Sequence, residues 1–495
     1  MPNLAALLLV RLAPTRLSAN PTTATALLTH TSVAPLTTTL FASSIHVNET
    51  AAGRSHRWFP HFTAIPLDGN ATALVGSTGT DDDGACGGEK PCLPRTHHIS
   101  LDGGRTFSEI EIEGMPKFNT TRAMQGGRPK HGGGLNMFYV LPTGTPGQAL
   151  VLPGSDSGLV NSDGTTGVHT DLVRGSAWSD AGGTMSVSST GSVTFTPTRQ
   201  NFTFTGFPRN TSCWPPNMYW RVIDLPDGKK LGTANAGWVG GAGGNNKAMV
   251  AVVSSDGGTN WRYLSTIANE SRWPAVPHAE GMGEHSVSLT PSGRLVCVWR
   301  TNGGHHRAIG PSGPGVLPYN FSVSLDGSGL TWSDPRVMRD VTGYTMGSAQ
   351  PQLLFVPGSA PGRKGVVLLA GGRSGSFLWH SPDGEHWSTL NLATAHNTLR
   401  SGGALPAGEP AALFTPPWTE RDQPAAYNAT QPPSWPTKGY YNPDCAQSTM
   451  YTSISAVGSS TVVLVYDRIG NGWWGPPGPF GSDDHVFAMR LQVSV

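Results

Sequence analysis

The stretch Ser100-Leu101-Asp102-Gly103-Gly104-Arg105-Thr106-Phe107 decides the fold of this chain, because its pattern occurs four times. The pattern is Ser-X-Asp-X-Gly-X-Thr followed by Trp or Phe, and the other copies occupy residues 254–261, 324–332 and 381–387. The second copy has Asn260 at the Thr position, the third carries one extra residue, and the fourth lacks one. Four copies indicate a repeat architecture in which each copy belongs to one structural unit.

Each residue type in the pattern has a structural reason. Glycines permit a tight hairpin turn with positive φ, and the Asp accepts hydrogen bonds from backbone N–H groups of that turn. The aromatic ring then folds back under the hairpin and packs into the sheet. The four aspartates are 154, 70 and 57 residues apart, so one unit takes 57–70 residues and the long gap holds a unit whose copy has decayed. About 450 residues at this pitch give six or seven blades of a β-propeller.

The composition supports an all-β fold. The chain of 495 residues holds 64 Gly and 41 Pro, spread along its length, and only 13% of its residues are charged. Short apolar runs are separated by turn residues, no stretch shows sustained helical periodicity, and no run approaches the ~20 apolar residues of a membrane span. A formal net charge of +1 without a basic stripe argues against nucleic-acid binding.

Several features predict a secreted or luminal protein. Residues 1–35 are rich in Leu, Ala and Thr, and we interpret them as a targeting segment with a disordered lead-in. Five cysteines fit an oxidising compartment, and Cys86 and Cys92 are placed to close a Gly-rich loop. Asn-X-Ser/Thr acceptors are more frequent than we expect by chance. They occur at Asn48, Asn70, Asn119, Asn201, Asn210, Asn269, Asn320 and Asn428.

The four copies resemble the Asp-box of the sialidases, the glycoside hydrolases that release terminal sialic acids. The resemblance implies a six-bladed β-propeller over residues 36–495 and an exo-α-sialidase-like activity. In this family the boxes lie on the face away from the active site. None of the box aspartates is therefore a catalytic candidate.

Three further segments are similar to sialidase motifs. In residues 283–300 a glutamate opens a strand and an arginine ends the return strand, which implies Glu284 as general base and Arg300 as one of three carboxylate-binding arginines. Arg373 precedes an Asp-box by the spacing of a second such arginine. Residues 448–453 resemble the motif that supplies the nucleophile, which makes Tyr451 the candidate.

The acid catalyst and the third arginine match less well. Asp81, Asp82 and Asp83 lie about where the family keeps its acid/base Asp, and we take Asp82, the central one, as the candidate. Three adjacent carboxylates raise one another's pKa, which suits an acid, but a solvated loop or a Ca²⁺ site fits them equally. The family's N-terminal Arg-Ile-Pro motif is replaced by Arg-Trp-Phe-Pro at 57–60. An ungapped match puts Trp58 at the arginine position, so the candidate Arg57 is displaced by one residue.

The chemistry explains why these residue types occur together. Sialic acid carries a carboxylate on its anomeric carbon, so a neutral phenol attacks there with less repulsion than a carboxylate would. A Tyr hydroxyl needs an adjacent base, and the planar fork of Arg matches a substrate carboxylate. We predict a retaining glycosidase that acts on sialylated or other acidic-sugar glycans as a monomer and needs no metal or cofactor.

Two other functions remain open. A propeller that kept the boxes and lost the first arginine contact would bind carbohydrate or protein ligands without catalysis. A propeller glycosidase for a neutral or different acidic sugar would use two carboxylates, such as Glu284 and Asp82.

Overall fold

The structure is a computed structural model of the chain. The residues that it describes are 8–10, 38–45, 58–79, 96–115, 138–153, 160–161, 176–179, 183–198, 200–208, 211–212, 222–238, 247–269, 279–303, 319–341, 349–358, 365–372, 377–401, 411–414, 448, 451–468 and 485–493.

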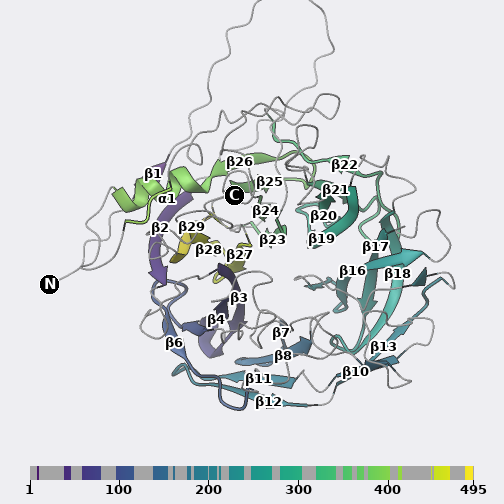
Figure 1. The fold of residues 1–495 in the computed structure, drawn as a ribbon, viewed down its shortest axis with the longest axis horizontal. Coiled ribbons are helices and arrows are strands. Elements are labelled where there is room, and N and C mark those ends of the chain that lie inside the picture. The colour runs from purple at the N-terminus through teal and green to yellow at the C-terminus, as the bar shows by residue number, and fades with distance from the viewer. Residues whose placement is uncertain are drawn as a thin grey trace, which may run out of the picture.

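Six β-sheets are arranged in a ring around a central axis (Figure 1). We number these sheets as blades 1 to 6 in chain order. From the inner edge outward, blade 1 consists of β3 (Trp58–Pro66), β4 (Thr72–Gly79), β5 (Thr96–Ser100) and β6 (Ser108–Ile110), and blade 2 of β7 (Phe138–Pro142), β8 (Gln148–Pro153), β11 (Gly183–Val187) and β12 (Val193–Pro197). Blade 3 consists of β14 (Thr211–Ser212) with β15 (Ile223–Asp224), then β16 (Lys230–Trp238), β17 (Lys247–Ser254) and β18 (Asn260–Asn269), and blade 4 of β19 (Ala279–Leu289), β20 (Leu295–Gly303), β21 (Asn320–Val323) and β22 (Arg336–Val337). Blade 5 consists of β23 (Gln352–Val356), β24 (Val366–Gly371), β25 (Phe377–Ser381) and β26 (Ser388–Asn391), and blade 6 of β27 (Ser453–Ala456), β28 (Thr461–Arg468), β29 (His485–Gln492), β2 (Thr38–Ile45) and β1 (Leu8–Val10).

Six hydrophobic clusters close the ring, one at each boundary between consecutive blades. Ile65 of blade 1 packs in one cluster with Val151 of blade 2, and the same arrangement repeats around the ring. The last cluster joins Val463 and Val465 of blade 6 to Leu74 of blade 1. Because every sheet buries both faces against its two neighbours, the chain forms a closed all-β propeller of six blades.

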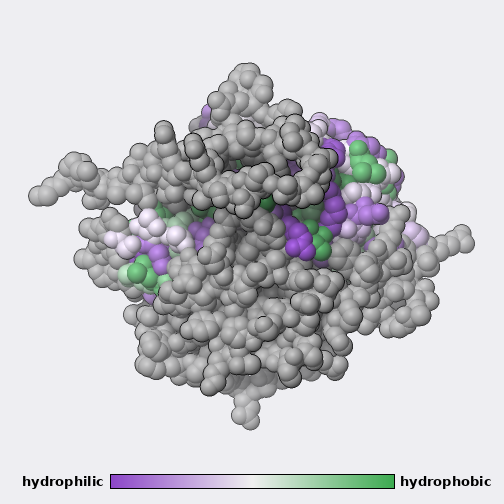
Figure 2. Space-filling view, turned by 90° about the horizontal axis from the view of Figure 1, so that it is seen from above, coloured by the Kyte–Doolittle hydropathy of each residue, from purple (hydrophilic) through white to green (hydrophobic). Residues whose placement is uncertain are grey.

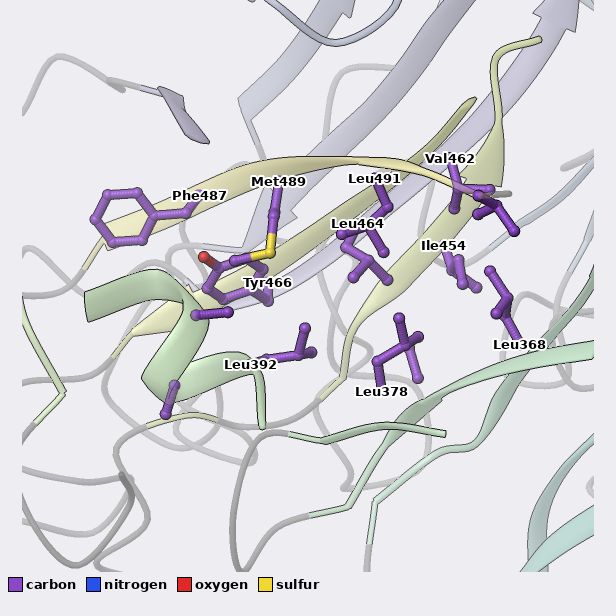
Figure 3. Packing of buried hydrophobic residues seen from close by; sticks show 14 of the residues in the cluster. Leu368, Leu378, Leu392, Ile454, Val462, Leu464, Tyr466, Phe487, Met489 and Leu491 are labelled. Atoms are coloured by element: carbon purple, nitrogen blue, oxygen red, sulfur yellow. The ribbon is translucent and has the colours of Figure 1, made fainter. Parts of the chain in front are cut away.

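The boundary between blades 5 and 6 shows how this packing works (Figure 3). Leu378 of β25 faces Leu464 of β28, and both are fully buried. Tyr466, Phe487 and Met489 extend the cluster along the same side of blade 6. These residues follow the strand period of two, which places alternate side chains on one face.

An α-helix covers this boundary, which the sequence did not predict. Helix α1 (Leu392–Ser401) follows β26 directly, and its first turn is capped by Asn391, whose side chain accepts a hydrogen bond of 3.0 Å from Thr394 N. Its Leu392 enters the cluster of Figure 3. Ten residues with one buried stripe give too short a periodic signal for the sequence to reveal this helix. No helix of the described segments is long and apolar enough to cross a membrane.

The boxes form the turns that the pattern predicted. Each lies between the third and fourth strand of its blade, as between β5 and β6. Gly103 and Gly104 have φ of 69° and 79°, and Asp102 Oδ1 accepts hydrogen bonds of 2.9 Å from Arg105 N and 3.0 Å from Thr106 N. Trp261, Trp332 and Trp387 are buried beneath their hairpins. In blade 2 the corresponding turn, 188–192, has no box, which confirms the decayed copy.

Blade 6 is closed by strands from the two ends of the sequence. Strand β2 pairs antiparallel with β29, and β1 pairs with the outer edge of β2. Leu8–Val10 are therefore in a strand, within the segment that the sequence led us to interpret as a targeting segment with a disordered lead-in. The targeting role of residues 1–35 and the boundary at residue 36 stay predictions.

Blade 3 carries an extension at its outer edge. Strand β13 (Gln200–Thr205) pairs parallel with β18, and β10 (Ser176–Ser179) and β9 (Val160–Asn161) continue the sheet outward. This gives an eight-stranded sheet, whereas blades 1, 2, 4 and 5 have four strands each.

The blades share one polarity, which defines two ends of the ring. Neighbouring inner strands are joined by side chains: Leu353 N donates to Ser286 Oγ at 3.1 Å, and Phe62 N donates to Ser453 Oγ at 3.0 Å. The starts of β19, β23, β27 and β3 therefore lie at one end, and the boxes lie at the other.

Surface features bear on the predicted glycosylation sites. Asn70 is exposed at the end of the 3-10 turn η1 (Asp68–Asn70), whereas Asn320 is 2% exposed within β21. Of these two acceptors only Asn70 has room for a glycan in the folded protein. The described residues visible in Figure 2 mix hydrophilic and hydrophobic side chains.

Candidate active site

A β-bulge in blade 4 brings Glu284 beside Arg300. Met282 pairs with Thr301 and His285 with Trp299, so Gly283 and Glu284 together stand opposite the single residue Arg300. A bulge of this kind bends the strand and redirects a side chain. Here Arg300 Nη1 donates to Glu284 Oε2 at 3.0 Å.

Tyr451 reaches the same pair from blade 6, where it lies two residues before β27. Its hydroxyl donates to Glu284 Oε1 at 2.6 Å and accepts from Arg300 Nη1 at 3.2 Å. The two hydrogen bonds span 167 and 151 residues of sequence. Ring closure therefore assembles one cluster, Glu284–Arg300–Tyr451, from β19, β20 and the segment just before β27.

Burial and charge set the protonation states in the cluster. The side chain of Arg300 is 6% exposed and that of Glu284 is 20% exposed. Burial alone would lower the pKa of Arg300, but the adjacent Glu284 carboxylate and Tyr451 raise it above its ordinary value. Arg300 is thus a permanent cation. A short O–H···O⁻ bond to a carboxylate is a strong one, and it points the Tyr451 proton at Glu284.

His285 stabilises the bulge through a contact with Gly283. Its ring is fully buried, and Nδ1 lies 3.2 Å from the carbonyl oxygen of Gly283, which can only accept. Burial lowers the pKa of His285, while hydrogen bonds to the backbone of Thr233 and of Gly283 oppose that shift, and the Gly283 bond is the one at the bulge. This bond fixes the backbone next to Glu284.

Two residues near the cluster were assigned no role from the sequence. Gln350 is 2% exposed, and its amide nitrogen has no hydrogen-bond partner among the residues that the structure describes. It precedes β23 by two residues, at the same end of the ring as the starts of β19 and β27. Tyr319 is fully buried and affects the charge balance of Arg300. A polar residue just before an inner strand was the available signal for Gln350.

The other predicted site residues, Arg57, Asp82 and Arg373, lie outside the described residues. The Cys86–Cys92 pair does too. Asp82 follows β4, which ends at Gly79, and Arg373 follows β24, which ends at Gly371. Both strands end on the side of the ring that carries the cluster. The described parts of the chain contain no group of three His, Cys, Asp or Glu side chains arranged for a metal ion.

Comparisons with solved structures find proteins of similar fold. An alpha-L-arabinofuranosidase from Fusarium graminearum, solved with an iminosugar inhibitor, is 15% identical over 91% of this chain and 97% of that one, with a TM-score of 0.47. A Hadza microbial sialidase is 13% identical over 89% of this chain and 65% of its own, with a TM-score of 0.47. Trypanosoma rangeli sialidase is 12% identical over 90% of this chain and 57% of its own, with a TM-score of 0.44.

No family model matches the chain, and no curated protein sequence matches it significantly. The likeness to solved structures concerns the fold. The propeller itself follows from the six sheets and the six clusters between them.

Proposed function

We propose that this protein is an exo-α-sialidase-like retaining glycosidase. The observation that supports the proposal most directly is the hydrogen bond of 2.6 Å from Tyr451 Oη to Glu284 Oε1, with Arg300 donating to both. A nucleophile beside its base, oriented by a third group, is the arrangement of covalent catalysis. A phenol in that place suits a sugar whose anomeric carbon bears a carboxylate.

The first step forms a covalent intermediate. Tyr451 Oη attacks the anomeric carbon while its proton passes to Glu284 Oε1. The bond from that carbon to the glycosidic oxygen breaks, and Asp82 donates the proton that the leaving oxygen needs. Arg300 donates to the phenol oxygen and so stabilises the negative charge that develops on it before the new bond is complete.

The second step releases the sugar. Asp82, now a carboxylate, takes a proton from a water molecule, and the water oxygen attacks the anomeric carbon from the side that the leaving group occupied. The bond to Tyr451 breaks, and Glu284 returns its proton to the phenol. Two displacements at one carbon retain the anomeric configuration.

The substrate carboxylate is held by arginines in this proposal. Arg300, Arg373 and Arg57 are the candidates, since a guanidinium donates two parallel hydrogen bonds to a carboxylate. Gln350 is a further donor to the substrate: its buried amide nitrogen has no partner among the described residues, and such a group is costly until a ligand accepts its hydrogen bond.

The experiment measures hydrolysis of two fluorogenic substrates by the purified full chain, an α-sialoside and an α-L-arabinofuranoside. We expect turnover of the sialoside alone, and a loss of about 100-fold or more in kcat for Tyr451→Phe and for Glu284→Gln. Tyr263→Phe is the matched control, because its hydroxyl hydrogen-bonds Thr266 within blade 3, away from the cluster, at 2.8 Å.

Each other outcome selects a different function. Turnover of the arabinofuranoside alone would favour a neutral sugar and a second carboxylate as the nucleophile. Glycan binding without turnover of either substrate would favour a non-catalytic propeller. Full sialoside turnover by Tyr451→Phe would refute the assignment of the nucleophile.

A further inference from the structure

Tyr319 extends the candidate site across blade 4. Asn320 pairs with Trp299 in the ladder between β20 and β21, so Tyr319 stands opposite Arg300 at the next position. Residues directly opposite in an antiparallel pair have their side chains on the same face of the sheet. Glu284, Arg300 and Tyr319 thus form one row across three strands, and Tyr319 is its outer, fully buried member.

The hydroxyl of Tyr319 connects this row to blade 5. It donates to the carbonyl oxygen of Ala349 at 2.8 Å, the residue just before Gln350. It also lies against Gly371 at the end of β24: a Cβ at this position would meet Tyr319 Oη at 2.5 Å and the Gln350 carbonyl oxygen at 3.0 Å. Gly371 has φ of 142°. Two backbone segments of blade 5, Ala349–Gln350 and Gly371, therefore meet around the Tyr319 hydroxyl.

The protonation state of Tyr319 suits a fixed donor. Burial raises its pKa far above the ordinary value, the electrostatic influence of Glu284 and Tyr451 adds to the shift, and Arg300 and the hydrogen bond to Ala349 oppose it. The phenol keeps its proton throughout the accessible pH range. It can therefore hold Ala349 while the neighbouring cluster exchanges protons.

We infer that Tyr319 is a positioning residue that holds the Ala349–Gln350 backbone so that the Gln350 amide can bind the substrate. This inference rests on the proposed function, and it concerns substrate binding and not the chemical step. The phenol does not touch the reacting atoms. Its hydrogen bond fixes a segment that precedes β23 and lies before the ladder of blade 5, which among the described residues begins at Gln352.

The test replaces Tyr319 by Phe in the full chain and measures sialoside hydrolysis. We expect KM to rise about tenfold, the size of effect of losing one hydrogen bond to the substrate, with kcat within about twofold. The pH profile of kcat should not move, because Tyr451 and Glu284 keep their contact. Tyr466→Phe is the matched control: this tyrosine is equally buried and bonds His396 at 2.8 Å, but it faces the core between blades 5 and 6.

A double-variant comparison separates positioning from general loss of stability. If Tyr319 acts through Gln350, then Tyr319→Phe with Gln350→Met raises KM no further than Gln350→Met alone. Independent, multiplying effects on KM would overturn the inference. So would a lowered melting temperature with unchanged KM in Tyr319→Phe, which would leave the proposed function standing. Absence of wild-type turnover would overturn both.

Discussion

At the scale of single residues, the Tyr451 hydroxyl has two partners of opposite charge. It donates to the Glu284 carboxylate and accepts from the Arg300 guanidinium. The first partner can take its proton, and the second stabilises the oxygen that remains. Arg300 Nη1 also bonds Glu284, so the three groups orient one another before a substrate arrives. Such preorganisation costs no rearrangement at the moment of reaction.

Another buried residue, His396, predicts how stability depends on pH. Burial lowers its pKa to about 3, the hydrogen bond to the Ala412 carbonyl opposes this, and the charges of Arg400 and Arg468 add to it. In the unfolded chain the same group titrates near 6.5. The stability that a neutral His396 contributes is therefore complete above about pH 6.5 and is lost as the pH falls toward 3.

We expect His396 to give the free energy of unfolding a slope of about 1.4 kcal/mol per pH unit across that window. Urea unfolding of the wild type and of His396→Gln, measured from pH 7 to pH 4, checks it. The variant should show the shallower slope. Equal slopes would mean that His396 is protonated in the folded protein.

At the scale of elements, the box turns were predictable because their constraints are local. The glycines, the Asp and the aromatic residue act within eight residues, so the pattern specifies the hairpin directly. Helix α1 was not predictable, because its stability comes from contacts across the fold. His396 and Asn397 bond the backbone of Ala412 and Phe414, and Leu392 packs against blade 6. A short helix owes most of its stability to such packing.

Two glycines of the box turns distinguish the requirement for a positive φ from the requirement for space around the glycine. Gly257 has φ of 84° with open space around its Cβ position, whereas Gly104 has φ of 79° and a Cβ there would lie 2.7 Å from Val463 Cγ2. Gly257→Ala should cost about 1–2 kcal/mol from backbone strain alone. Gly104→Ala should cost about 1–3 kcal/mol more, because blade 6 must move away from blade 1. Chemical denaturation measures both, and equal losses would contradict the packing of this box against blade 6.

At the scale of the whole molecule, ring closure determines which residues of the candidate site can be predicted from the sequence. Glu284 and Arg300 belong to one hairpin, so the sialidase-like motif that pointed to both of them is a single continuous segment. Tyr451 reaches them only because the closed ring of six blades brings the segment before β27 in blade 6 to the hairpin in blade 4. No local sequence pattern contains that information. Only the resemblance to a known motif pointed to it. Gln350 and Tyr319 were assigned no role from the sequence, since their roles depend on contacts between blades.

Closure of the ring through β2 predicts where the chain can be shortened. Strand β2 pairs with β29 over six residues, while β1 adds three pairs at the outer edge. A chain that starts at residue 36 should therefore fold and keep the melting temperature of the full chain within a few degrees. A chain that starts at residue 47 loses β2, exposes the edge of β29 and should aggregate. Size-exclusion chromatography and thermal unfolding of both chains test this, and a stable monomer without β2 would contradict the closure.

The most direct test of Tyr451 as the nucleophile is to trap the covalent intermediate. A 2,3-difluoro sialic acid loses its anomeric fluoride to the attacking nucleophile, and the second fluorine slows hydrolysis of the product. Peptide mass spectrometry of the full chain should find the fluorosialosyl group on Tyr451, and Tyr451→Phe should carry none. A sugar attached to Glu284, or an unmodified chain that hydrolyses sialosides at the full rate, would contradict it.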